Sequence, residues 1–322
     1  MFRWAGIATV PQLERMLDDA ERATRATAAP GAEELLAKAD RMHAARQHVE
    51  AATLYRQVLE TAPPHWPARP RAVESWLLAL WGAKRLEECA EVAARHVGSL
   101  PRSPSLANAA SLGLLCAVSA SGQPWQREKL PVLEGLAQEA LRIPDVLADD
   151  RSGLYELLVE ARAAAGDNAG ARQVAGQWLG FLQQQVAQTT DPELRAAFDS
   201  HVLSASLALG EPARAVERLM ASERDLPGDY NAPARLAVAY RELGKLEEAQ
   251  AAAERALSKV YGPRKLRVMQ TLADIQKRRG DLAGMRKTLT DAVAFAQGIP
   301  VDQRPRGVVE AMEAQLKAAA GP

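Results

Sequence analysis

One frame of glycine and small apolar residues recurs along this chain and constrains its fold more than any other feature. Its turn position is held by four glycines that each interrupt a helical pattern: Gly166, Gly210, Gly244 and Gly280. The fifth residue after each turn is small or apolar: Ala171, Ala215, Ala249 and Met285. Two further registers have arginine at the turn, with Arg46 followed by Ala51 and Arg85 followed by Ala90. Six copies of one frame indicate an internal structural repeat.

Each copy of the frame is expected to fold as two antiparallel helices. A glycine readily adopts the left-handed conformation that ends one helix and lets the chain reverse. Small residues on both helices then let the two axes approach closely. Aromatic residues make up only 5% of the chain, which suits helices packed through small side chains better than it suits β-sheets. Because one pair cannot bury its own apolar face, successive pairs must stack into a solenoid.

The spacing of the copies predicts the extent of the array. Ala215 and Ala249 are 34 residues apart, and Ala249 and Met285 are 36 apart. The 81 residues between Ala90 and Ala171 leave room for one degenerate pair near 104–143, with helices expected at 104–120 and 127–142. We therefore predict a repeat array of about six or seven helix pairs over residues 32–298, capped by a helix at 305–319.

The copy Leu236-Ala237-x-x-Tyr240-x-x-x-Gly244-x-x-x-x-Ala249 resembles the tetratricopeptide repeat family. The resemblance implies an all-α fold, a right-handed α-solenoid of helix hairpins. It also implies that the first helix of each pair lines the concave surface on which such proteins hold their partners. Arg46 and Arg85, in place of glycine, depart from the family pattern.

Residues 1–26 do not fit the frame. Phe2 to Ile7 predict a short N-terminal strand, and a helix is expected from Pro11 onward. This segment resembles the last strand and helix of a thioredoxin-like domain. The resemblance implies an oxidoreductase domain upstream of Met1, with its redox cysteines there and the repeats positioning its substrates or partners. The alternative interpretation is an irregular cap on the array.

No catalytic constellation is recognised in the sequence. Among the five histidines, His43 and His48 are five residues apart and are expected to point in different directions, which does not favour a zinc site. The sequence contains no phosphate-binding loop, nucleophile elbow or dinucleotide fingerprint. We therefore predict no enzymatic activity, no cofactor and no metal site for this chain. A formal net charge of zero argues against nucleic-acid and membrane-surface binding.

The two cysteines, Cys89 and Cys116, are interpreted as separate buried hydrophobic residues. Both fall in apolar helical patterns, and neither belongs to a Cys-x-x-Cys pair. No apolar run is long enough to span a bilayer, and the first residues lack the features of a signal peptide. These observations predict a cytoplasmic location.

Candidate partner-binding residues lie on the first helices of the two best copies: Asn231, Arg241, Arg267, Gln270, Asp274 and Lys277. With Arg264, Lys265, Arg278 and Arg279 nearby, they predict a basic groove for an acidic peptide. Cations at a helix end before Gly280 are also expected from the helix dipole alone. The leading hypothesis is a protein–protein interaction scaffold that binds a peptide or partner domain on its concave face. The alternative is the partner-positioning region of a thioredoxin-like oxidoreductase.

Overall fold

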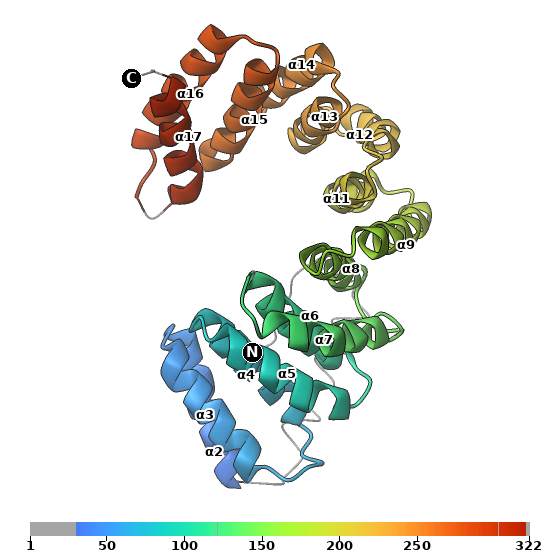
Figure 1. Cartoon of the computed structure of the whole chain (residues 1–322), viewed down its shortest axis with the longest axis vertical. Coiled ribbons are helices and arrows are strands. Elements are labelled where there is room, and N and C mark those ends of the chain that lie inside the picture. Colours follow the sequence, from blue (N-terminus) through green and yellow to red (C-terminus); the bar gives the residue numbers. More distant parts are fainter. Residues whose placement is uncertain (1–29, 121, 302, 320–322) are drawn as a thin grey trace. The chain divides into compact units, whose positions relative to one another are not determined.

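The computed structural model describes residues 30–120, 122–301 and 303–319, and these residues fold into a succession of helices (Figure 1). The helices up to residue 187 are α2 (Pro30–Ala44), α3 (His48–Thr61), α4 (Arg69–Gly82), α5 (Leu86–His96), α6 (Pro104–Ser119), α7 (Gln126–Ala140), α8 (Ala148–Ala164) and α9 (Asn168–Ala187). The later helices are α10 (Pro192–Ala196), α11 (Asp199–Leu209), α12 (Ala213–Asp225), α13 (Asn231–Glu242), α14 (Leu246–Leu257), α15 (Lys265–Arg278), α16 (Leu282–Gln297) and α17 (Arg306–Ala319). Two short 3-10 helices, Val97–Ser99 and Gly262–Arg264, complete the set.

These elements confirm the predicted all-α solenoid of helix hairpins, since the described residues contain no strand. The predicted strand over Phe2–Ile7 and the helix from Pro11 lie outside the described residues. Helices α6 and α7 pack against each other in the region of the degenerate pair. Helix α17 occupies the place of the predicted capping helix and packs on α15 and α16.

The helix pairs share one recurrent turn. In all six copies, the amide of a left-handed residue donates to the carbonyl three residues back, and the next amide donates to the carbonyl four residues before the left-handed one. At Gly244, for example, the two bonds reach Arg241 O at 3.1 Å and, from Lys245, Tyr240 O at 2.9 Å. This Schellman arrangement satisfies carbonyls that a helix end otherwise leaves unpaired. Local hydrogen bonds therefore fix where each chain reversal occurs.

One register of the predicted frame is wrong. The turn expected at Arg85 lies at Lys84, which has φ +60°, whereas Arg85 has φ −87° and precedes α5 as its N-cap. Neither Lys84 nor Arg85 is a glycine, so residue type does not show which of them is the turn residue. Ala90 is a small residue five positions after Arg85, and it therefore made Arg85 fit the frame. In the corrected register the fifth residue after the turn is Cys89. The turn at Arg46, with φ +60°, lies where it was predicted.

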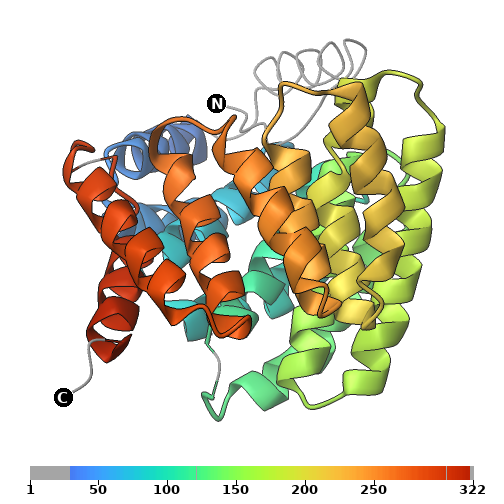
Figure 2. The same ribbon diagram turned by 90° about the horizontal axis from the view of Figure 1, so that it is seen from above.

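The described helices belong to two compact units, one up to Trp178 and one from Leu179 onward. In the first unit, α2 to α8 enclose a core rich in alanine and leucine. In the second, the pairs α11–α12, α13–α14 and α15–α16 stand side by side, as the yellow-to-red helices of Figure 2 show. The array predicted over 32–298 is thus divided inside α9.

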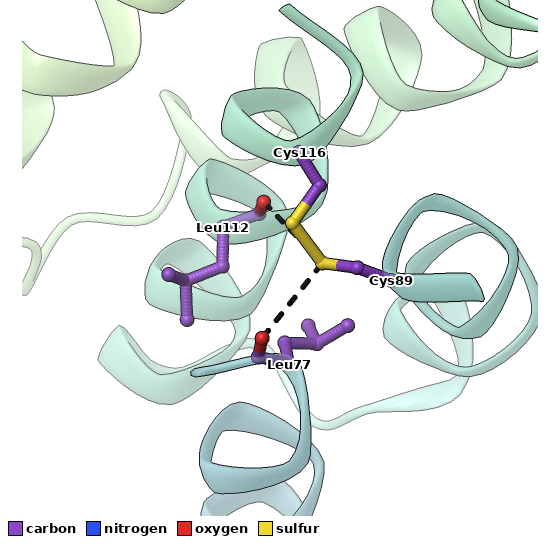
Figure 3. Close-up of a disulfide and its surroundings, with 4 residues drawn as sticks. All are labelled: Leu77, Cys89, Leu112 and Cys116. Atoms are coloured by element: carbon purple, nitrogen blue, oxygen red, sulfur yellow. Dashed lines mark hydrogen bonds between the residues drawn. A yellow bond between two sulfur atoms is a disulfide. The ribbon is translucent and has the colours of Figure 1, made fainter. Parts of the chain in front are cut away.

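Cys89 and Cys116 form a disulfide between α5 and α6 (Figure 3). Both side chains are fully buried, and their Cα atoms lie 6.1 Å apart. The interpretation as separate buried thiols is therefore wrong. Its physical reason is the shifted register: Cys89 occupies the small-residue position at which the second helix of each pair packs closely, and α5 packs on α6 there. The Sγ atom of Cys89 also lies 3.8 Å from the carbonyl oxygen of Leu77 on α4 (Figure 3).

The disulfide should stabilise the first unit. Closing a loop of 27 residues lowers the entropy of the unfolded chain, so the double change Cys89→Ala with Cys116→Ala should lower the free energy of unfolding by about 3 kcal/mol. Alanine suits the buried position of Cys89 because other copies have alanine there. Urea unfolding followed by tryptophan fluorescence reports on this unit, since all six tryptophans precede Leu179. Wild-type protein under reducing conditions should match the variant, and two alkylatable thiols in the non-reduced protein would contradict the bridge.

The left-handed arginine should cost stability that glycine would recover. Arg46→Gly should raise the free energy of unfolding by roughly 0.5–1 kcal/mol, because a side chain is disfavoured at positive φ. The matched control is Arg85→Gly, at φ −87°, which should destabilise because it also removes the ion pair with Glu88. Equal effects of the two changes would show that the left-handed turn costs nothing.

Candidate partner-binding surfaces

The first helices of successive pairs contact one another and share a continuous surface. In the second unit, α13 contacts both α11 and α15, and α15 contacts α17. In the first unit, α4 contacts α2 and α6, and α6 contacts α8. We call the exposed faces of α13 and α15 the basic surface, and those of α2, α4, α6 and α8 the acidic surface.

Two of the predicted residues come together on the basic surface. Arg241, at the end of α13, has its Nη1 atom 3.7 Å from Asp274 Oδ2 on α15 and donates from Nε to Glu242 Oε1 at 2.8 Å. Arg278 on α15 reaches the same Glu242 oxygen at 3.3 Å. Burial would raise the pKa of Glu242, but the hydrogen bond and charges of Arg241 and Arg278 outweigh it and lower the pKa. This network ties neighbouring repeats together.

The other four predicted residues do not join that network. Asn231 begins α13 and donates from Nδ2 to Asp229 Oδ1 at 2.8 Å. Gln270 is partly buried on α15. Arg267 and Lys277, also on α15, are exposed, and neither has a carboxylate at ion-pair distance among the described residues. Cations therefore outnumber carboxylates on the basic surface, and Arg267 and Lys277 are exposed there without an ion-pair partner among the described residues.

The acidic surface was missed from the sequence, although it uses the same frame. Asp40, on α2, accepts from Tyr55 Oη at 2.8 Å and pairs with Arg71 of α4. Glu74, three residues after Arg71, accepts from Asn108 Nδ2 of α6 at 3.2 Å. Equivalent positions on first helices hold Asp40, Glu160 and Asp274, six residues before the turn, and Glu74, Glu156 and Gln270, ten residues before it. Projecting every copy of the frame, with the turn at Lys84, would have found them.

Two carboxyl groups of the acidic surface have strongly raised pKa values. Burial raises the pKa of Glu74 to about 7; the charge of Asp150 adds to the rise, while Asn108 and Arg71 oppose it. Burial also raises the pKa of Asp150, on α8, to about 6, with the charge of Asp149 adding to it. The charge of this surface therefore changes near neutral pH, a property found often at functional sites.

His43 and His48 come closer together than expected. Their ring centroids lie 5.2 Å apart, because the turn at Arg46 folds the end of α2 against the start of α3. The expectation that they point in different directions is wrong. Two imidazoles do not make a metal site, and no group of three or more histidine, cysteine or acidic side chains within the described residues is placed to hold a metal ion.

A known structure shares this fold, and two others were compared with it. A tetratricopeptide repeat protein from Parabacteroides merdae ATCC 43184 superposes with a TM-score of 0.57 at 10% identity, over 90% of this chain and 99% of that one. The TPR2AB domain of yeast Sti1 in its pHSP90 complex gives 0.33 at 16% identity, over 90% and 98% of the two chains. The apo form of RapI gives 0.44 at 10% identity, over 83% and 76%. No family model and no curated protein matches the sequence.

The described residues thus have the tetratricopeptide repeat fold that the sequence predicts. The thioredoxin-like resemblance concerns residues outside the described part and stays a prediction, as does the cytoplasmic location. Among the described helices, none combines the length and apolarity needed to cross a membrane.

The raised pKa of Glu74 predicts a pH-dependent effect of Glu74→Gln. The folded protein keeps a proton that the unfolded chain releases as pH rises from 4.5 to about 7, so wild-type stability falls over this range and the loss is complete above it. Glutamine carries no such proton and can still accept from Asn108. The variant should therefore be about 1–2 kcal/mol more stable than wild type at pH 8, and equal to it at pH 4.

Urea unfolding at the two pH values, followed by tryptophan fluorescence, measures this difference. Glu60→Gln, at an exposed position of α3, is the matched control and should show the same small effect at both. A gain for Glu74→Gln that does not change with pH would contradict the assignment.

Proposed function

We propose that this chain is a protein–protein interaction scaffold that binds an acidic peptide segment on the basic surface of α13 and α15. The proposal rests chiefly on the two exposed, unpaired cations of α15, Arg267 and Lys277. Functions carried by folds of this kind depend on surface side chains rather than on the fold itself. Unpaired cations on a surface formed by neighbouring repeats favour recognition of carboxylates.

The spacing of these cations suggests the form of the partner. Arg267 and Lys277 are ten residues apart on one helix, a rise of about 15 Å. An extended peptide covers that distance in about four to five residues. We therefore expect two acidic side chains about four residues apart in the bound segment.

The neighbouring carboxylates favour a peptide over a nucleic acid. Glu242 and Asp274 lie among the cations, where they would repel a continuous row of phosphates. A peptide can place its own polar groups against them. The net charge of zero over the whole chain agrees with this preference.

Charge reversal of the unpaired cations should weaken peptide binding. Peptides selected from a random displayed library with the wild-type protein should be enriched in pairs of acidic residues about four positions apart. Arg267→Glu with Lys277→Glu should weaken binding of a selected peptide by about tenfold or more. Fluorescence anisotropy measures the affinity, and circular dichroism should show unchanged helicity.

The matched control carries the same charge change away from the basic surface. Arg224→Glu with Lys287→Glu alters exposed positions on the second helices α12 and α16 and should leave the affinity within about twofold. Equal losses in both double variants would mean that only overall charge matters. Unchanged affinity in Arg267→Glu with Lys277→Glu would remove the basic surface as the binding site.

A further inference from the structure

A hollow of about 420 Å³ lies among α9, α10, α11 and α12 in the second unit, away from α15. Its polar side carries three guanidinium groups, Arg195 on α10 with Arg214 and Arg218 on α12. Its remaining lining is largely apolar and includes Leu179, Val186 and Val202. The volume falls in the range of small-ligand sites, which are roughly 300–1,000 Å³.

Two of the three arginines have a carboxylate partner and the third has none. Arg218 donates from Nε to Asp199 Oδ1 at 3.0 Å, and Arg214 lies 3.2 Å from Glu211 Oε2. Among the described residues, no carboxylate lies within ion-pair distance of Arg195. The polar side of the hollow therefore has one uncompensated positive charge.

The arginines are also held in place. Asp199 is fully buried and fixes the guanidinium of Arg218, whose side chain is only 13% exposed. Helix α10, which carries Arg195, packs on α12, and Asp191 caps its first turn by accepting from the amide of Glu193 at 2.8 Å. Arg195 Nε and Arg218 Nη1 are buried nitrogen atoms that have no acceptor within the part of the chain that the structure describes. Both atoms belong to guanidinium groups that line the hollow, and a guanidinium group whose donors are not all satisfied favours an anion beside it.

The geometry points to a binding site for a carboxylate carried on a short apolar body. One net positive charge matches one carboxylate, and the planar guanidinium groups suit its two oxygen atoms. The apolar side would cover the body of the ligand. This site is separate from the basic surface and does not depend on the proposed peptide function.

Hexanoate is a suitable probe because it joins one carboxylate to a short alkyl chain, and hexanamide is its neutral counterpart of similar shape. In ¹H–¹⁵N spectra of the full chain, the Nε–H signals of Arg195 and Arg218 should shift and saturate with hexanoate. Hexanamide should bind at least about tenfold more weakly, because it lacks the charge. An equal response to both probes would overturn the assignment, as would the absence of any saturable shift.

Three variants and two further probes complete the test. Arg195→Gln and the more exposed Arg214→Gln should each weaken hexanoate binding several-fold, whereas Arg224→Gln, on the same helix but outside the hollow, should not. Thermal unfolding shows which variants remain folded. Inorganic phosphate binding as tightly as hexanoate would overturn the carboxylate class. A short peptide ending in leucine, with a free or an amidated C-terminus, shows whether the site takes the C-terminal carboxylate of a peptide or only a small free acid. Binding of the free peptide but not of the amidated one supports the site with a peptide as ligand, and binding of hexanoate alone supports it with a small acid as ligand. Equal binding of the free and the amidated peptide would contradict it.

Discussion

In the six copies of the frame, the left-handed residue that ends the first helix determines where the second helix can begin. Its two Schellman hydrogen bonds close the first helix, and the second helix begins two residues later in five of the six copies and three residues later after Gly210. The fifth residue after the turn consequently faces the first helix. Ala51, Cys89, Ala215 and Ala249 are all fully buried there, which lets neighbouring axes approach closely.

This constraint explains how much of the fold the sequence could predict. Glycine at four turns marks the reversal because left-handed backbone strongly favours glycine, and the period of the frame then locates the helices. Where the turn residue is Lys84, the same information is missing and the register slips by one residue. That slip also hid the disulfide, because it placed Ala90 rather than Cys89 at the position that packs on α6. A contact between two helices of neighbouring pairs cannot be inferred from spacing along the chain alone.

The sequence could predict which helix positions are exposed on the candidate surfaces, but it could not predict which side chains form ion pairs there. The frame identifies which positions on a first helix are exposed, and Arg267 and Lys277 are found exposed as projected. It cannot identify which side chains meet across helices, because that depends on rotamers and on the approach of two axes. Arg241 and Asp274 were both singled out, yet they largely compensate each other. Glu74 differs for another reason: its raised pKa comes from burial and from Asp150, on a helix two pairs away.

In a chain whose formal charges sum to zero, the charged side chains without an ion-pair partner are the ones that indicate where a charged ligand could bind. Exposed pairs such as Arg279 with Glu247 contribute little to stability, roughly 0–1 kcal/mol each, and can exchange partners at small cost. A charge without a partner gives no such stabilisation to the fold, so its place on the surface is free to serve binding. Arg267 and Lys277 are such unpaired charges on α15. Arg195 is another, at the hollow among α9 to α12, where Arg214 and Arg218 already have carboxylate partners. The stacked helices fix the backbone positions that carry these cations, and so they set the spacing that the carboxylates of a bound partner would have to match.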